Sequence, residues 1–138
     1  MDEAILDTDI LSEVLKRKDQ QVLGHAQQYL ATHQRFAFSA ITLYEIIRGM
    51  RANRATRQLN DFLKTVGTSD VYPVSIPVLM RAAELWAEGR NGGHPHEDAD
   101  LIIAATALDA QRVLVTGNAN HYTWINGLQI ADWRQPIP

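Results

Sequence analysis

Short apolar runs alternate along this chain with longer segments of helical periodicity, and this order constrains the fold more than any other feature. The apolar runs have the length of strands and fall at residues 4–7, 36–40, 71–74 and 112–117, with a further short one near the end of the chain. Strands that alternate with helices predict a mostly parallel sheet covered by helices on both faces. We therefore expect an α/β fold, a three-layer α/β/α sandwich, in a single domain that spans residues 1–138.

The segments between these runs space their apolar residues three and four positions apart. Helices are predicted at residues 10–17, 20–33, 42–66, 76–90 and 98–111, with a possible break in the third near residues 49–53. The chain has 138 residues, of which 46% are hydrophobic and 21% charged. A chain of this length and composition can bury one substantial core, so we expect an ordered globular protein.

Cysteine usage and the first residues exclude several classes of protein. The sequence contains no cysteine, which excludes disulfides, thiolate-bound zinc and a cysteine nucleophile. It begins with the acidic stretch MDEAILDTD, whereas a signal peptide has a basic start and a long apolar run. No apolar run approaches the roughly 20 residues needed to cross a membrane. We expect a cytoplasmic protein with no membrane partner.

Polar residues follow the predicted strands at the positions where a parallel sheet binds its ligands. Asp7 ends the first apolar run, Glu45 follows the second, and Asn118 follows the run at 112–117. Asp100 lies in the first turn of the helix before that last run. Ligands of open α/β sheets bind beyond the carboxyl ends of the strands, so we expect these four side chains to meet at one end of the sheet.

Carboxylates that gather at one point repel one another unless a cation binds among them. Ligand sets made only of oxygen suit Mg²⁺ or Mn²⁺ better than zinc. Such ions activate water and stabilise the charge on a transferring phosphoryl group. The residues therefore favour metal-assisted hydrolysis of a phosphodiester.

Each of these residues also has a purely structural interpretation. Asp7 could begin a turn or cap the next helix. Thr42 and Glu45 form the pattern of a capping box, in which the glutamate would bond the Thr42 amide. Asn118 could be a turn residue or a helix cap. Position alone does not decide between these roles and a metal site.

The stretch GGHPHEDAD at residues 92–100 contains three acids, which helical geometry separates. Residues two apart on a helix point to nearly opposite sides, so Asp98 and Asp100 cannot face one metal in the same way. Asp100 heads the apolar stripe that should pack on the sheet. Glu97 and Asp98 are better explained as helix-start residues, where acids meet free backbone amides.

Two histidines in the same stretch, His94 and His96, flank a proline in a glycine-rich loop. Their spacing differs from the i, i+4 spacing of the helical zinc motif H-E-x-x-H. We expect them in an exposed loop over the site and not in the metal shell.

The formal net charge of −3 does not indicate a general nucleic-acid binder, but the basic residues are clustered. Four arginines recur every three residues and would form a basic stripe along a helix suited to RNA, namely Arg48, Arg51, Arg54 and Arg57. A second basic patch comprises Lys16, Arg17 and Lys18. The alternative for the stripe is an ordinary solvated helix face.

Five segments together resemble the PIN domain, and most closely its VapC-type ribonuclease toxins from bacterial toxin–antitoxin pairs. These segments are AILDTD (4–9), SAITLYEIIRG (39–49), DLIIAATA (100–107), LVTGNANHY (114–122) and GLQIADW (127–133). The resemblance extends over essentially the whole chain, in order. It implies an α/β/α sandwich, an endoribonuclease site dependent on Mg²⁺ or Mn²⁺, a homodimer, and an antitoxin partner that blocks the site.

The resemblance also implies roles for individual residues. Asp7 and Asp100 match two family acids and would ligate the metal, while Glu45 matches a third and would orient or deprotonate the attacking water. Asn118 replaces a fourth acid that many PIN domains carry; with Asp9 and Thr116 it would support the site from outside the metal shell. Apolar stretches at residues 10–15 and 59–66 could supply partner surfaces. The main alternative is a non-catalytic PIN-like domain that binds RNA or a protein.

Overall fold

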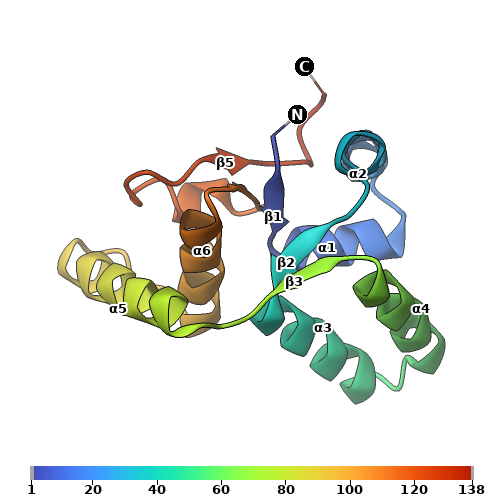
Figure 1. Ribbon diagram of the computed structural model, residues 1–138, viewed down its shortest axis with the longest axis horizontal. Helices are drawn as coiled ribbons and strands as arrows, with labels where there is room; N and C mark the ends of the chain where they lie inside the picture. Colours follow the sequence, from blue (N-terminus) through green and yellow to red (C-terminus); the bar gives the residue numbers. More distant parts are fainter. Residues whose placement is uncertain (1, 138) are drawn as a thin grey trace.

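The structure is a computed structural model that describes residues 2–137, and its strands and helices alternate along the chain (Figure 1). The strands are β1 (Ala4–Leu6), β2 (Ala37–Ser39), β3 (Asp70–Tyr72), β4 (Val113–Val115) and β5 (Ile130–Ala131). The helices are α1 (Thr8–Lys16), α2 (Gln20–His33), α3 (Ala40–Ala52), α4 (Thr56–Gly67), α5 (Ile76–Asn91) and α6 (Asp98–Ala110), with a 3-10 turn η1 at Ala119–His121. The predicted alternation is confirmed.

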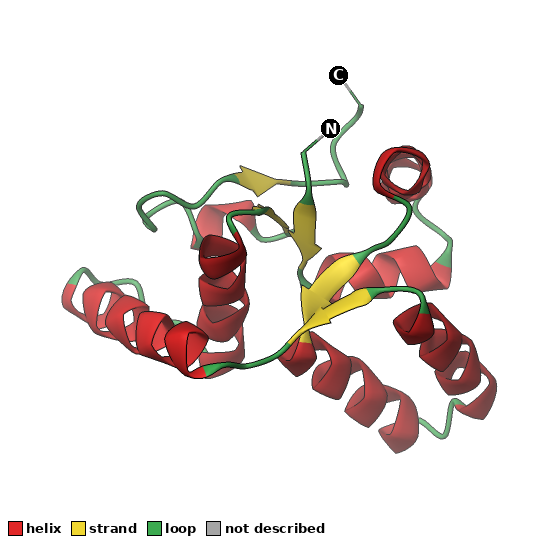
Figure 2. Cartoon of the chain, viewed as in Figure 1, coloured by secondary structure: helices red, strands yellow, loops and turns green. Residues whose placement is uncertain are grey.

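All the strand pairs are parallel, as predicted. β4 pairs with β1 on one side and with β5 on the other, and β2 pairs with β3. β1 and β2 lie side by side and join the two groups of strands. The strands occupy the centre of the molecule with helices around them (Figure 2). β1 is therefore a central strand, and the residue that follows it lies in the middle of the sheet's carboxyl edge.

Alternate residues of the strands pack on opposite faces of the sheet, which accounts for the layers. Leu6 and Val115 belong to a core cluster that also contains buried residues of α1, α2, α3 and α4. Ile5 and Leu114 belong to a second cluster, built with α5 and α6. Because side chains along a strand alternate between faces, the apolar run of β1 serves both clusters. This arrangement confirms a sheet between two helical layers.

The helical segment predicted over residues 42–66 is two helices in the structure, so the break considered near residues 49–53 is confirmed. α3 ends at Ala52, and Arg54 adopts a left-handed backbone conformation with φ of 53°. The amide of Ala55 then donates to the carbonyl of Met50 at 2.9 Å, which reverses the chain into α4. The apolar periodicity continues across the break because both helices pack on the same core.

Within residues 2–137, no helix is both long and apolar enough to span a bilayer.

Candidate active site

Asp7 follows β1 directly and is the N-cap of α1, so the two interpretations of this residue are compatible. Its side chain is only 5% exposed. The Thr8 amide donates to Oδ1 at 2.7 Å, and the Thr116 hydroxyl donates to Oδ2 at 2.7 Å. Thr116 follows β4, the strand beside β1. Two adjacent strand ends therefore fix one carboxylate at the centre of the carboxyl edge.

Burial raises the pKa of Asp7 from its ordinary 3.8 to about 7. The negative charge of Asp9 adds to this effect, and that of Asp100 does so to a smaller extent. The hydrogen bonds from Thr116 and Thr8 lower the pKa but do not outweigh burial. A carboxylate that is costly to ionise, next to two other acids, is the arrangement that a bound cation would stabilise.

Asp100 lies in the first turn of α6 and is electrostatically linked to the other acids. Burial raises its pKa, as do the charges of Glu97 and Glu45, whereas a hydrogen bond with Tyr122 lowers it. Asp98 is exposed, while Asp100 is half-buried. The predicted separation of the two aspartates is therefore confirmed. Tyr122 is almost fully buried and was not singled out in the sequence, although it lies within a segment of the family resemblance.

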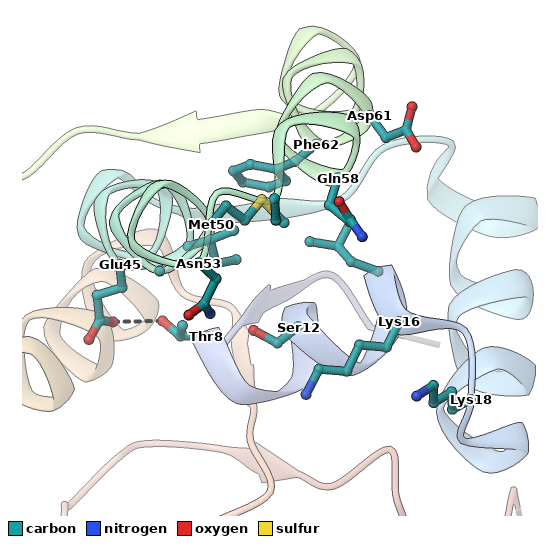
Figure 3. A pocket seen from close by; sticks show the side chains of 14 residues that line it. Thr8, Ser12, Lys16, Lys18, Glu45, Met50, Asn53, Gln58, Asp61 and Phe62 are labelled. Atoms are coloured by element: carbon teal, nitrogen blue, oxygen red, sulfur yellow. Dashed lines mark hydrogen bonds between the residues drawn. The ribbon is translucent and has the colours of Figure 1, made fainter.

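The capping box considered as the alternative role of Thr42 and Glu45 does not form in the structure. Ser39 ends β2 and caps α3 itself, accepting from the Ile41 amide at 3.1 Å. The helix therefore starts before Thr42, which is fully buried within it. Glu45 is left available for another partner: the Thr8 hydroxyl donates to its Oε1 at 2.7 Å (Figure 3). Thr8 thus connects Glu45 to the residue beside Asp7.

Asp9 is held in place by the loop that follows β4. Its Oδ2 accepts from the Gly117 amide at 3.0 Å and from Nδ2 of Asn118 at 3.3 Å, and lies 3.7 Å from Nη2 of Arg134. Burial nevertheless raises the pKa of Asp9. Asn118 therefore donates to an acid near the site and is the N-cap of η1. Arg134 partly balances the Asp9 charge and had no signal in the sequence beyond its own charge.

The prediction of one arginine stripe along a helix is wrong, because α3 ends before the third arginine. Arg48 and Arg51 belong to α3, Arg54 lies in the connection, and Arg57 belongs to α4. All four are exposed. Nη2 of Arg48 lies 3.8 Å from Oε2 of Glu45, which places this cation beside the acids.

Across residues 2–137, no three histidine, cysteine, aspartate or glutamate side chains gather into a ready-made metal cage. Mg²⁺ does not require such a cage, because it usually keeps several waters and is held by one or two carboxylates. Asp7 is a buried acid, Asp100 is a half-buried one, and the charge of Asp100 opposes the ionisation of Asp7. The oxygen donors present fit a hydrated divalent ion. That the histidines stay outside its shell remains a prediction.

A groove with a volume of about 550 Å³ extends from the site between α1, α3 and α4. Thr8 and Glu45 line one end, and Leu15 and Phe62 contribute apolar lining (Figure 3). In the apolar stretches considered as partner surfaces, Ile10 and Phe62 are fully buried, whereas Leu63 is exposed and Leu15 lines the groove.

Known proteins are similar to this chain in sequence and in fold. A profile of the PIN domain matches residues 4–123. Ribonuclease VapC1 of Methanocaldococcus jannaschii is 26% identical over 130 residues, which cover 93% of this chain and 86% of that protein. The tRNA(fMet)-specific endonuclease VapC of Shigella flexneri is 25% identical over 130 residues, covering 94% and 96%. The crystal structure of DNA-bound VapBC from Salmonella typhimurium is similar with a TM-score of 0.83 at 25% identity, covering 96% of this chain and 99% of the other. Because the profile spans most of the sequence, the chain belongs to the PIN domain family.

Proposed function

We propose that this PIN domain is a metal-dependent endoribonuclease and the toxin of a type II toxin–antitoxin pair. The observation that carries the proposal is the convergence of Asp7, Glu45 and Asp100 at the carboxyl end of the central strands. These acids come from three separate segments, and Asp100 interacts electrostatically with both of the others. Relatives named VapC are ribonucleases, which supports RNA as the substrate.

Asp7 and Asp100 are the residues that would hold Mg²⁺ or Mn²⁺, with water completing the shell. When bound, the ion supplies an activated water and stabilises charge on the phosphodiester. Thr116 positions Asp7 by donating to Oδ2, so one carboxylate oxygen has a fixed orientation. Asn118 and Asp9 brace the loop after β4 and support the site without contacting the ion.

Glu45 is the residue that would orient or deprotonate the attacking water. Its Oε1 accepts from Thr8, and its Oε2 faces Arg48 at 3.8 Å. These two contacts hold the Glu45 carboxylate in a fixed position beside the other acids, and a carboxylate so held could accept a proton from water. General-base catalysis of this kind contributes roughly 100- to 10,000-fold to a rate.

The protein partner that we propose is an antitoxin seated in the groove between α1, α3 and α4. One of the solved structures similar to this chain is a toxin–antitoxin complex from Klebsiella pneumoniae. The groove combines apolar lining with Lys16 and Lys18 and leads to Glu45, so a segment bound there would cover the acids. A homodimer acting in the cytoplasm remains part of the proposal. The four exposed arginines are proposed to contact RNA phosphates.

Cleavage of RNA in the presence of Mn²⁺ tests the catalytic proposal. Glu45→Gln should lose roughly 100-fold or more of the rate, and Asp100→Asn should also lose Mn²⁺ affinity. Asp109→Asn is the matched control, because Asp109 is an exposed acid on the same helix, α6. All three variants should keep the fold and the cooperative unfolding of the unchanged protein. Full activity of either site variant would remove that residue from the mechanism.

The asparagine at position 118 favours one alternative, a non-catalytic PIN-like domain that binds RNA or a protein. Such a domain should bind Mn²⁺ poorly in a calorimetric titration and should not cleave RNA. Expression in a bacterium that lacks the antitoxin separates a toxin from other nucleases, because only a toxin should arrest growth.

A further inference from the structure

Four aromatic side chains gather beside the site, and the proposed mechanism does not use them. We call them the aromatic cluster: His94, His96, His121 and Trp124. The His94 and Trp124 rings are stacked, with centroids 5.5 Å apart and planes 2° apart. The His96 ring lies 5.4 Å from Trp124 and 6.0 Å from His121. The cluster joins the loop between α5 and α6 to η1, which ends at His121, and to the segment that follows it.

The loop that carries the two histidines is fastened to the end of α5. The His94 amide donates to the Gly89 carbonyl at 2.6 Å. Gly89 is buried, and a Cβ added there would lie 2.6 Å from the His94 carbonyl oxygen and 3.0 Å from the Trp124 ring. The backbone can approach this closely only because the residue is glycine. The cluster is therefore preformed before any ligand binds.

Hydrogen bonding fixes the proton arrangement of the cluster. The Trp124 indole N–H donates to Nε2 of His96 at 2.9 Å and to the His121 carbonyl at 2.8 Å. The two acceptors share the single indole N–H, and this geometry favours the His96 tautomer in which Nε2 accepts and Nδ1 carries the proton. His96 is thus held as a neutral ring with one N–H to offer. The cluster presents flat faces and a neutral donor.

The cluster borders a cavity of about 420 Å³ that also reaches the candidate metal ligand Asp100. Its lining includes the carboxylates of Glu97 and Asp100 and, among the described residues, neither lysine nor arginine. This lining therefore offers a phosphate group no lysine or arginine partner, only the ion proposed at Asp100. The lining also provides flat histidine rings and neutral hydrogen-bonding groups such as the Asn120 amide. Such a lining suits an uncharged planar ligand group.

We propose that the aromatic cluster binds one unpaired nucleobase of the RNA, next to the phosphodiester that is cut. This inference rests on the proposed function, since Asp100 would bind the ion at that phosphodiester. Proteins read single-stranded RNA by stacking splayed bases on aromatic or histidine rings and bonding their edges. The exposed face of His94 provides the stacking surface, and His96 provides the donor. Cleavage should therefore require a base that can leave its helix.

Binding of a fluorescently labelled, unstructured oligoribonucleotide without divalent cations tests the inference. An abasic residue is placed at each position of the oligonucleotide in turn. With the unchanged protein, one abasic position should weaken binding roughly 5- to 20-fold. His94→Ala should weaken binding of the intact oligonucleotide by a similar factor, and the same abasic position should then cost nothing further. His94→Phe keeps a flat ring and should restore binding, while the control His33→Ala, on α2, should leave it unchanged.

Abasic sensitivity that is identical in the unchanged protein and in His94→Ala would overturn the inference, and so would binding by His94→Phe as weak as that by His94→Ala. Absence of RNA binding would overturn it as well. Addition of Mn²⁺ to the same samples reports the proposed function separately. The expected binding pattern without cleavage would support the base site and refute the nuclease.

Discussion

Replacing Asp7 with asparagine should stabilise the metal-free protein at neutral pH, although it removes a proposed metal ligand. The carboxylate is nearly fully buried and lies near two other acids. An asparagine can keep both local hydrogen bonds: its Oδ1 accepts from the Thr8 amide, and its Nδ2 can donate to the Thr116 hydroxyl. The variant therefore loses the buried charge and little packing.

The size and sign of the effect follow from the pKa of Asp7, which folding raises from 3.8 to about 7. Between about pH 4 and pH 7, the Asp7 carboxyl keeps its proton in the folded state, whereas in the unfolded chain it has already lost that proton. The free energy of unfolding therefore falls as pH rises through this range. Above both pKa values the cost reaches about 4 kcal/mol, at about 1.4 kcal/mol for each pKa unit. The stability difference between the variant and the unchanged protein should grow by roughly 2–3 kcal/mol from pH 5 to pH 8.

Urea unfolding at pH 5 and pH 8, with EDTA present, measures this difference. Asp109→Asn serves as the control, because Asp109 is exposed. The stability difference between this variant and the unchanged protein should be similar at the two pH values. Added Mn²⁺ should then stabilise the unchanged protein by mass action and leave Asp7→Asn largely unaffected. If Asp7→Asn is the less stable protein at pH 8 without metal, or if the difference is the same at both pH values, the electrostatic reasoning is refuted.

Three further predictions concern the surroundings of the site. Thr116→Val removes a buried hydrogen-bond donor to Asp7, so it should lower the free energy of unfolding by about 1–3 kcal/mol. It should also raise the pKa of Asp7 further and shift Mn²⁺ binding to higher pH in calorimetric titrations. Gly89→Ala places a methyl group against the His94 carbonyl and should lower stability by about 1–3 kcal/mol in thermal unfolding, whereas Gly49→Ala, where nothing lies within 4 Å, should not. The double variant Arg51→Gln, Arg57→Gln should bind single-stranded RNA with a weaker salt dependence. The slope of log K against log salt concentration should fall by about 0.7 for each phosphate that the variant no longer neutralises. An unchanged slope would exclude both arginines from RNA binding.

The fold could be predicted from the sequence because the strand residues have strong and local signals. β1 is apolar at every position since both faces of this central strand are covered. The break between α3 and α4 was harder to place, because Leu59 and Phe62 continue the apolar period beyond it and no proline marks it. The left-handed conformation of Arg54 decides that break and is not a preference of arginine.

The site could be predicted only in part, for a related reason. The positions of Asp7 and Asp100 follow from the topology of a parallel sheet, so the order of the elements was sufficient. A capping role for Glu45 was inferred from a local pattern alone. In the structure Ser39 is the cap, because it ends β2 at the point where α3 begins. The partnership of Arg134 with Asp9 joins residues at opposite ends of the chain, and no local pattern indicates such an ion pair.

Because Asp7 is buried and the histidine loop is exposed, the two sides of the site should open to solvent in different ways, one by global unfolding and the other by local opening. Asp7 lies between Leu6 and Ile10, which are fully inaccessible to solvent, so its surroundings should come apart only when the whole domain unfolds. Asp100 begins a helix next to an exposed loop, and such a segment can open locally at a small fraction of that free energy. Amide hydrogen exchange should therefore be slowest around Asp7 and much faster across residues 92–97. The Asp7 side of the site therefore depends on the stability of the whole fold, whereas the loop proposed to meet the RNA base is free to change its sequence and its specificity.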